Sequence, residues 1–253
     1  MSSTSAPLLP NATIVDRSDL TESIACFRIR SDAAPVAFVP GQYVTVGLGV
    51  DERLVQRPYS IASSARRLDD GYELYVRLVP GGALTPHLFR TRPGERVVLR
   101  RPKGRFALRP VDDRTHLFVA TGCGLAPFMS MLRTLDDDRA PRRVIVVHGV
   151  SYADELGYRS ELERWAQDPR WALRYVPTVS RPGDPRNAGW TGRTGRAEAV
   201  LAALLAEPSF DPARAIAYVC GNPEMTVTAD RLLRVAGLDD ASVQKELYWP
   251  LAR

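Results

Sequence analysis

Apolar and polar residues alternate in short runs along the first hundred residues, and turn-forming residues separate these runs. Alternation with a period of two over runs of this length predicts half-buried strands. The expected strands cover residues 12–16, 24–29, 42–48, 59–62, 72–79 and 96–99. Their spacing predicts an antiparallel β-barrel or sandwich. A short helix is expected at Thr85, because threonine is a good N-cap residue and Pro86 suits the first helical position.

From His116 onward the pattern changes, and apolar strands alternate with stretches of helical periodicity. The expected strands are 117–120, 144–147, 174–179 and 215–220, and the expected helices are 126–135, 153–166, 196–205 and 224–235. This alternation predicts an α/β doubly wound parallel sheet, in which ligands bind beyond the carboxyl ends of the strands. We therefore expect two domains, residues 1–105 and 113–253, with the linker within 101–114.

Composition and charge narrow the classes of protein that remain. A chain of 253 residues favours two domains, and 45% hydrophobic with 25% charged residues is typical of a soluble protein. No segment reaches the ~18 apolar residues of a membrane span, and residues 1–11 lack a signal-peptide pattern, so we expect a cytoplasmic protein without a membrane partner. The net charge of +5 is interleaved with acidic residues. That distribution argues against nucleic acid and favours an anionic cofactor or an acidic protein partner.

Cysteine and histidine usage excludes further classes. Cys26, Cys123 and Cys220 lie far apart, which excludes a disulfide framework and leaves too few thiolates for an iron–sulfur cluster. Any such cluster must therefore reside on a partner. The three histidines are isolated in the sequence, and we assign no metal or acid–base role to them.

The first candidate motif is Arg57-Pro58-Tyr59-Ser60, on an expected strand. Alternation places Arg57 and Tyr59 on one face, where a guanidinium can bind phosphate and a phenol can pack on a flat ring. The alternative is a plain strand with one exposed arginine and one packed tyrosine. The glycine turn 81–85 favours a pyrophosphate site, because backbone N–H groups at a helix start point at an anion.

Two further motifs follow strands of the second domain. Residues 121–127, Thr-Gly-Cys-Gly-Leu-Ala-Pro, suit close approach of a dinucleotide, although they lack the third glycine of the G-x-G-x-x-G fingerprint. A tight turn with no ligand is the alternative. Residues 220–224, Cys-Gly-Asn-Pro-Glu, end a later strand, where Cys220 is either a site residue or a small buried residue.

Hydroxyl and guanidinium groups gather after a third strand, and two aromatic residues end the chain. Ser180, Arg181 and Arg193 suit a ribose 2′-phosphate, with solvated loop charges as the alternative. Tyr248 and Trp249 follow the last apolar run. Trp249 is expected to stack on the ring of a cofactor, with core packing as the alternative.

Taken in order, these motifs resemble the ferredoxin–NADP reductase family, in particular its bacterial branch. The resemblance covers nearly the whole chain and also includes Asp154-Glu-Leu-Gly-Tyr158 and Thr191-Gly-Arg193. It implies a flavoprotein oxidoreductase that takes a hydride from NADPH onto FAD and passes single electrons to ferredoxin or flavodoxin. We expect a monomer.

The resemblance also implies residue roles. FAD is expected on the barrel, in contact with Arg57, Pro58, Tyr59, Ser60, Tyr75, Val76, Arg77, Leu78, Ala83, Leu84 and Thr85. NADP(H) is expected on the second domain, in contact with Thr121, Gly122, Cys123, Ser180, Arg181, Arg193, Asn222, Pro223 and Glu224. Tyr59, Cys220, Glu224 and Trp249 are expected to shape hydride transfer, and Trp249 must move aside for nicotinamide.

Two departures from the family pattern stand out. Ser151 occupies the position where this branch carries a third arginine for the 2′-phosphate, which weakens the expected preference for NADPH over NADH. Residues 250–253 extend beyond the terminal aromatic. Two other functions remain open: an NAD(P)H:flavin or oxygenase-component reductase, and a non-catalytic flavin-binding redox sensor.

Overall fold

The computed structural model describes residues 9–109 and 113–247. The chain divides into two compact units. The first runs to Ala107 and also includes Met129–Thr134, and the second comprises Leu108–Phe128 and the residues from Leu135 onward. Among the described residues, no helix is long and apolar enough to cross a membrane.

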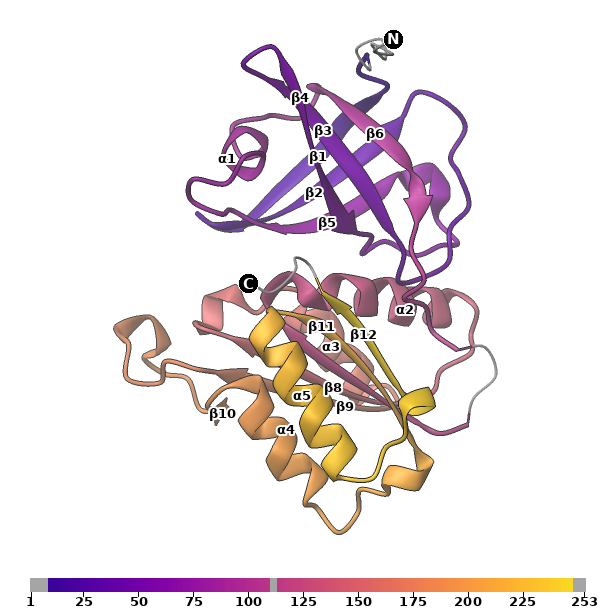
Figure 1. The fold of residues 1–253 in the computed structure, drawn as a ribbon, viewed down its shortest axis with the longest axis vertical. Helices are drawn as coiled ribbons and strands as arrows, with labels where there is room; N and C mark the ends of the chain where they lie inside the picture. The colour runs from indigo at the N-terminus through magenta and orange to yellow at the C-terminus, as the bar shows by residue number, and fades with distance from the viewer. Residues whose placement is uncertain (1–8, 110–112, 248–253) are drawn as a thin grey trace, which may run out of the picture. The chain divides into compact units, whose positions relative to one another are not determined.

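The first unit is built on a six-stranded antiparallel sheet (Figure 1). Its strands are β1 (Ala12–Thr21), β2 (Ile24–Ser31), β3 (Tyr43–Val50), β4 (Arg53–Ser60), β5 (Tyr72–Arg77) and β6 (Arg96–Lys103). The strand order is β4-β3-β6-β1-β2-β5. An isolated antiparallel bridge joins Ile61, just after β4, to Leu74 on the other edge strand. This bridge closes the sheet, so the expected antiparallel β-barrel is confirmed.

The barrel core follows from the alternation in the sequence. Phe27 and Ile29 on β2, Val44 and Val46 on β3, and Leu74 on β5 are all completely buried in one cluster. Full burial of a side chain of this size contributes about 1.5–3 kcal/mol. The period-two pattern therefore reports the inward face of each strand.

One strand differs from its expected position. We expected residues 59–62, whereas β4 begins at Arg53 and ends at Ser60. The β3–β4 hairpin turns through Asp51 and Glu52, whose φ angles of +46° and +61° are left-handed. Such turns normally carry glycine or asparagine, so the sequence gives no turn signal where this hairpin folds back.

The second unit contains a six-stranded parallel sheet, which confirms the expected doubly wound domain. Its strands are β7 (Thr115–Thr121), β8 (Arg143–Val150), β9 (Ala172–Val179), β10 (Arg193–Thr194), β11 (Ala215–Gly221) and β12 (Val243–Leu247). The order is β10-β9-β8-β7-β11-β12, so the direction of winding reverses between β7 and β11. Both strands are buried along almost their whole length. Continuous apolar runs are typical of strands covered on both faces.

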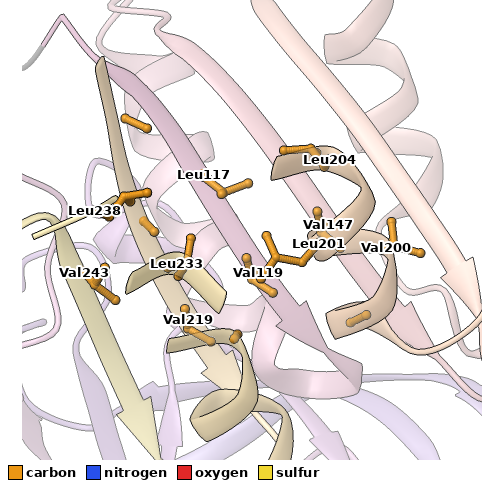
Figure 2. Packing of buried hydrophobic residues seen from close by; sticks show 14 of the residues in the cluster. Leu117, Val119, Val147, Val200, Leu201, Leu204, Val219, Leu233, Leu238 and Val243 are labelled. Carbon is orange, nitrogen blue, oxygen red and sulfur yellow. The ribbon is translucent and has the colours of Figure 1, made fainter. Parts of the chain in front are cut away.

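Helices cover the two faces of the parallel sheet. The helices of the chain are α1 (Thr85–Leu88), α2 (Ala126–Asp137), α3 (Arg159–Gln167), α4 (Ala197–Leu205) and α5 (Pro223–Val235). On one face, Leu201 of α4 and Leu233 of α5 pack over Val119 and its neighbours (Figure 2). On the other face, Phe118 stacks on Phe128 of α2 with ring centroids 4.6 Å apart. The adjacent β7 residues Phe118 and Val119 thus pack against helices on opposite faces of the sheet.

The expected helix 153–166 is broken into two parts. A 3-10 turn covers Ala153–Glu155, and α3 starts only at Arg159. Tyr158 precedes α3 with a left-handed φ of +59°. A helix cannot pass through a left-handed residue, and the break leaves the loop after β8 free to take its own shape.

Candidate functional site

Arg57 and Tyr59 lie near the end of β4, on the same face of the strand. In the β3–β4 ladder Arg57 lies opposite Val46, and Tyr59 lies opposite Val44. Both valines are completely buried, and directly opposed residues of an antiparallel pair share a face. Pro58, between them, projects to the other face. The guanidinium and the phenol therefore share one side of β4, as the alternation predicts.

The Tyr59 hydroxyl is a buried oxygen without a hydrogen-bond partner among the residues that the structure describes. Burial raises the pKa of this phenol, and the nearby Arg57 guanidinium lowers it by a smaller amount. The hydroxyl therefore stays protonated, at a cost of about 1–3 kcal/mol when no partner is present. A polar group of a bound ligand would remove that cost. This orphaned hydroxyl fits a flavin nucleotide held against β4.

Arg57 itself is exposed. Its Nη1 donates to the carbonyl oxygen of Gln56 at 2.7 Å. A guanidinium has five N–H donors in a planar fork, so this single bond leaves capacity for a phosphate. Arg57 and Tyr59 together match a ligand that combines phosphate with a flat ring.

The Thr85 side chain stabilises the glycine turn after β5 by two hydrogen bonds to Val79. The Thr85 hydroxyl accepts from the N–H of Val79 at 2.9 Å and donates to the Val79 carbonyl at 3.3 Å. Gly82 N–H also donates to that carbonyl, at 2.9 Å, and Gly81 takes a left-handed φ of +70°. These bonds fix the shape of the backbone between β5 and α1.

This geometry corrects one expectation from the sequence. Thr85 is not the N-cap of α1: the N-cap residue is Leu84, which makes no side-chain capping bond. The Thr85 hydroxyl is instead engaged with Val79, six residues earlier. The motif therefore acts in the structure by shaping the turn rather than by capping the helix.

The other predicted flavin contacts lie at the end of β4, on β5 and in the turn that follows β5. Ser60, Tyr75, Val76 and Leu84 are buried, Arg77 and Leu78 are half-buried, and Ala83 is exposed. The Val76 side chain belongs to the barrel core. The bridge between Ile61 and Leu74 brings β5 beside the end of β4. Contacts of Val76 with a ligand would have to use its backbone.

In the second unit, the winding of the sheet reverses where β7 ends at Thr121 and β11 ends at Gly221. In doubly wound sheets this reversal opens a crevice that binds ligands. The N–H of Asn222 donates to Thr121 Oγ1 at 2.9 Å. One hydrogen bond therefore ties together the two strand ends that border the expected site.

Glycines allow the backbones to approach each other at this point. A Cβ on Gly124 would lie 2.3 Å from the Cys220 carbonyl oxygen, and a Cβ on Gly221 would lie 2.3 Å from Thr121 Oγ1. Gly122 also needs its left-handed φ of +50°. The turn after β7 is thus packed directly on the end of β11. Main-chain atoms and the Thr121 hydroxyl therefore meet at this edge of the sheet.

The start of α5 is fixed by Asn222. Its side-chain oxygen accepts from the N–H groups of Glu224, at 2.9 Å, and Met225, at 3.3 Å. Pro223 is buried at the beginning of the helix, where a missing N–H costs no bond. The Glu224 side chain is exposed and lies 3.9 Å from Arg196. The Asn222 side chain therefore serves the helix, and Glu224 faces solvent.

The two cysteines of this edge differ in exposure. Cys220 is completely buried in β11, between Ala120 and Glu246 of the neighbouring strands. Cys123, in the turn after β7, is half-buried. Burial of Cys220 agrees with the alternative of a small core residue. Its expected part in hydride transfer stays a prediction.

His148, near the end of β8, holds the turn from the other side. Its Nε2 lies 3.3 Å from the Gly122 carbonyl oxygen, and its Nδ1 lies 3.2 Å from the Tyr175 hydroxyl. Complete burial lowers the pKa of His148 to about 4, and the Gly122 carbonyl and the Glu155 carboxylate oppose this shift. The imidazole is therefore neutral at neutral pH. We assigned His148 no role from sequence, although a histidine ending an apolar parallel strand was a usable signal.

The loops after β8 and β9 gather two guanidinium groups around Tyr152. Arg181 Nη1 donates to the Tyr152 hydroxyl at 2.5 Å, and its Cζ lies 5.3 Å from the ring centroid. Arg186 Cζ lies 3.8 Å from the same centroid, and its Nη2 lies 2.7 Å from Asp154 Oδ1. Cation–π contacts at exposed sites contribute about 0.5–1 kcal/mol each. Arg186 adds a cation that the sequence analysis did not single out.

Asn187 joins these two loops. Its side-chain oxygen accepts from Ala153 N–H at 2.8 Å, and its amide donates to the carbonyls of Ser151, at 3.0 Å, and Arg181, at 2.8 Å. Asn187 is almost completely buried, so these three bonds satisfy a polar group that burial would otherwise penalise. The sequence analysis missed this residue, and the neighbouring Asp184-Pro185 turn was the available signal.

Ser180 and Arg193 complete the predicted set around the end of β9. Ser180 N–H donates to the Val150 carbonyl at 2.9 Å, which continues the β8–β9 ladder by one residue. Arg193 lies beside Thr178 across the β9–β10 pair, and its Nη2 is 3.9 Å from Glu207. The structure thus puts Ser180 at the end of β9 and Arg193 on the neighbouring strand. Trp249, also predicted, lies outside the described residues.

Comparisons with known proteins bear on the whole arrangement. The oxidoreductase FAD-binding domain model matches residues 11–108, and the oxidoreductase NAD-binding domain model matches residues 118–231. These matches define the class as an oxidoreductase with one domain for FAD and one for a nicotinamide nucleotide. Ferredoxin–NADP reductase B of Sorangium cellulosum is 35% identical over 211 residues, 81% of this chain and 82% of that protein. The chain belongs to the ferredoxin–NADP reductase family.

Two more relatives mark the range of the family. Methane monooxygenase component C of Methylosinus trichosporium is 34% identical over 203 residues, which is 74% of this chain and 58% of that protein. A ferredoxin NADP+ reductase from Neisseria gonorrhoeae, solved with bound FAD and NADP, has the same fold. Its TM-score is 0.78 at 22% identity, over 94% of this chain and 98% of that one.

Proposed function

We propose that this protein takes a hydride from NADPH, by way of FAD, and delivers single electrons to a separate redox protein, ferredoxin or flavodoxin. The observation that carries the proposal is the glycine-lined reversal point between Thr121 and Asn222, on the same chain as a barrel that presents Arg57 and the unpaired Tyr59 hydroxyl. A nicotinamide donor and a flavin acceptor need these two kinds of site. The 35% identity to a ferredoxin–NADP reductase supports the choice of reaction.

In this proposal residues 1–105 form the FAD-binding domain. Arg57 binds the pyrophosphate, and Tyr59 and Ser60 contact the flavin part, with Tyr75–Leu78 and Ala83–Thr85 completing the contacts. Bound FAD supplies the chemistry that splits a two-electron hydride into single electrons. The protein's contribution is to hold the ring and to exclude water around the Tyr59 hydroxyl, which a ligand must satisfy.

Residues 113–253 form the NADP-binding domain in the proposal, with the C-terminal tail returning to the flavin. Ser180, Arg181 and Arg193 bind the 2′-phosphate. Thr121–Cys123 and Asn222–Glu224 receive the nicotinamide end, next to Cys220. Trp249 covers the flavin ring until the nicotinamide displaces it. The cations after β9 support this assignment, because charge-assisted bonds to phosphate are about twice as strong as neutral ones.

The electron acceptor is proposed to be an acidic protein. The chain has an excess of basic residues, with Lys+Arg 34 against Asp+Glu 29. Its three cysteines are too few to ligate an iron–sulfur cluster. A basic reductase and an acidic carrier attract each other, which raises the association rate at low salt. This charge balance supports ferredoxin or flavodoxin as the partner.

A second candidate is the reductase component of an oxygenase. The 34% identity to methane monooxygenase component C favours it. Ser151, where the bacterial branch carries an arginine for the 2′-phosphate, also fits an enzyme with a weaker preference for NADPH. Both candidates share the flavin and the nicotinamide site and differ in coenzyme and electron acceptor.

An anaerobic reduction experiment tests the proposal. Purified protein loaded with FAD is mixed with NADPH or NADH in a stopped-flow instrument, and the flavin absorbance is followed. Steady-state rates are then measured with ferredoxin, flavodoxin and free FMN. Faster bleaching by NADPH and a preference for the two proteins support the proposal. Preference for NADH together with poor reduction of both carriers favours the oxygenase component, and a flavin that neither coenzyme bleaches contradicts both.

A further inference from the structure

A chain of hydrogen bonds centred on a fully buried histidine runs across the parallel sheet to the turn after β7. Tyr175 on β9, His148 on β8 and Gly122 in the turn follow one another with separations of 3.2 and 3.3 Å. His148 has no exposed surface. Burying an imidazole in an apolar sheet is costly unless its nitrogens are paired. None of the assigned roles in the proposed reaction accounts for this residue.

The partners fix the tautomer of His148. The carbonyl oxygen of Gly122 can only accept, so Nε2 must carry the proton and donate it. Nδ1 is then an acceptor, and the Tyr175 hydroxyl is its donor. Both bonds therefore point in one direction, from Tyr175 through His148 to Gly122. The Gly122 carbonyl selects the tautomer, and the phenol, which can donate or accept, pairs with the nitrogen that remains.

The turn itself is restrained from both neighbouring strands of the sheet. On the β11 side, Gly124 packs on the Cys220 carbonyl and Thr121 Oγ1 accepts from Asn222 N–H. On the β8 side, His148 holds the carbonyl of Gly122, a residue in a left-handed conformation. A turn with this φ has several accessible backbone states, because glycine is permissive. The contacts with β11 do not restrain the side of the turn that faces β8, and the imidazole restrains that side.

We propose that His148 is a positioning residue for the reduced coenzyme, which it orients through the Gly122 carbonyl. This inference rests on the proposed function, because it takes the turn after β7 as the coenzyme site. Misplacement of a bound reactant by a small distance lowers the rate more than the affinity. His148 therefore affects hydride transfer without touching the coenzyme.

A matched pair of variants tests this role. Counted from Cα, the amide nitrogen of glutamine is as many bonds away as Nε2, whereas that of asparagine matches Nδ1. His148→Gln keeps a donor for Gly122, and His148→Asn does not reach it. Loss of one hydrogen bond corresponds to about a threefold to tenfold effect. We expect the limiting rate of flavin reduction by NADPH to fall about tenfold in the Asn variant and to stay within about twofold in the Gln variant.

Tyr175→Phe provides a second test of the hydrogen-bond chain, because it removes the partner of His148 Nδ1. Without the phenol, Nδ1 loses its donor, while the Gly122 carbonyl still holds the proton on Nε2. We expect a fall in limiting rate smaller than that of His148→Asn, with the Nε2–H tautomer retained in long-range proton–nitrogen correlation spectra. Tyr218→Phe is the control, because Tyr218 is a buried tyrosine on β11 whose hydroxyl accepts from Arg109 N–H at 3.1 Å. Its reduction kinetics should match the wild type.

The outcomes separate the two proposals. Equal limiting rates in His148→Gln and His148→Asn, with FAD retained and the wild type reduced by NADPH, overturn the positioning role and leave the proposed function intact. A wild-type flavin that neither coenzyme reduces overturns the proposed function, and this inference with it. An Nδ1–H tautomer in the wild-type spectrum contradicts the hydrogen-bond chain whatever the kinetics.

Discussion

The N–H of Asn222 and the side-chain oxygen of Thr121 lie 2.9 Å apart, and this bond joins the ends of β11 and β7. Asn222 thereby contributes twice: its backbone binds Thr121 and its side chain caps α5. The position of α5 is thus set by β7 as well as by its own strand.

Replacing Thr121 tests this connection. Thr121→Val keeps the shape and removes the acceptor, so we expect a loss of about 0.5–1.5 kcal/mol in the free energy of unfolding. Thr121→Ser keeps the acceptor and should stay closer to the wild type. Denaturant unfolding followed by circular dichroism measures both. Equal stabilities of the Val and Ser variants would contradict a stabilising bond.

Gly124→Ala tests the close approach of the two backbones. The new Cβ would meet the Cys220 carbonyl at 2.3 Å, and backbone atoms cannot move aside as a flexible side chain does. We expect a loss of about 1–3 kcal/mol in stability from overpacking. Gly183→Ala is the control, because no atom lies within 4 Å of its added Cβ. Thermal and denaturant unfolding should show little change for the control.

Tyr59→Phe tests whether the orphaned hydroxyl serves a cofactor. The apoprotein should be as stable as the wild type or more stable, because a buried unpaired hydroxyl is removed. The affinity for FAD should fall about threefold to tenfold, measured by fluorescence titration. Tyr72→Phe provides the opposite pattern, since its hydroxyl donates to the Val36 carbonyl at 2.9 Å. That control should lose stability and keep its affinity for FAD.

Arg181→Ala tests the site for the 2′-phosphate. A charge-assisted contact with phosphate is worth about 1.5–3 kcal/mol, so the KM for NADPH should rise more than tenfold. The KM for NADH, which lacks this phosphate, should change little. Arg170→Ala is the control, because Arg170 precedes β9 and pairs with Asp168 at 2.6 Å. An unchanged KM for NADPH in Arg181→Ala would remove this residue from the site.

The buried state of His148 predicts a pH dependence of stability. Its pKa is about 4 in the folded protein and about 6.5 when exposed in the unfolded chain. Between these values the unfolded chain binds the extra proton, so stability is full above about pH 6.5 and falls as the pH approaches 4. The whole shift corresponds to about 3 kcal/mol. The difference in unfolding free energy between wild type and His148→Gln, measured from pH 7.5 to 4.5, should shrink as the pH falls.

The sequence predicts the fold class well because periodicity reports burial directly. The runs 117–120 and 215–220 are apolar since β7 and β11 are covered on both faces, and their pattern matches that requirement. The sequence predicts a strand only from residue 59 and misses the start of β4 at Arg53, because Asp51 and Glu52 turn with left-handed angles without glycine. Periodicity predicts one helix over residues 153–166, because no local sequence signal indicates the left-handed φ of Tyr158 that separates the 3-10 turn from α3.

The candidate site is predictable only where a motif carries the chemistry. Arg57 and Tyr59 share a face as alternation requires. His148 bonds to the Gly122 carbonyl, 26 residues away, and Asn187 to the Ser151 carbonyl, 36 residues away, and no local pattern encodes such partners. Thr85 illustrates the same limit, because its partner is the Val79 backbone and not the helix that follows.

The contact between Gly124 and the Cys220 carbonyl has a consequence for protein engineering. In the proposed coenzyme site, main-chain atoms meet at this contact, so it offers no side chain through which coenzyme choice can be retuned. Under the proposed function, selectivity has to be altered at the rim of the site, where Tyr152, Arg181 and Arg186 present replaceable side chains on two loops that Asn187 joins by hydrogen bonds. Libraries aimed at switching between phosphorylated and unphosphorylated coenzymes should therefore randomise that rim and leave both glycines untouched.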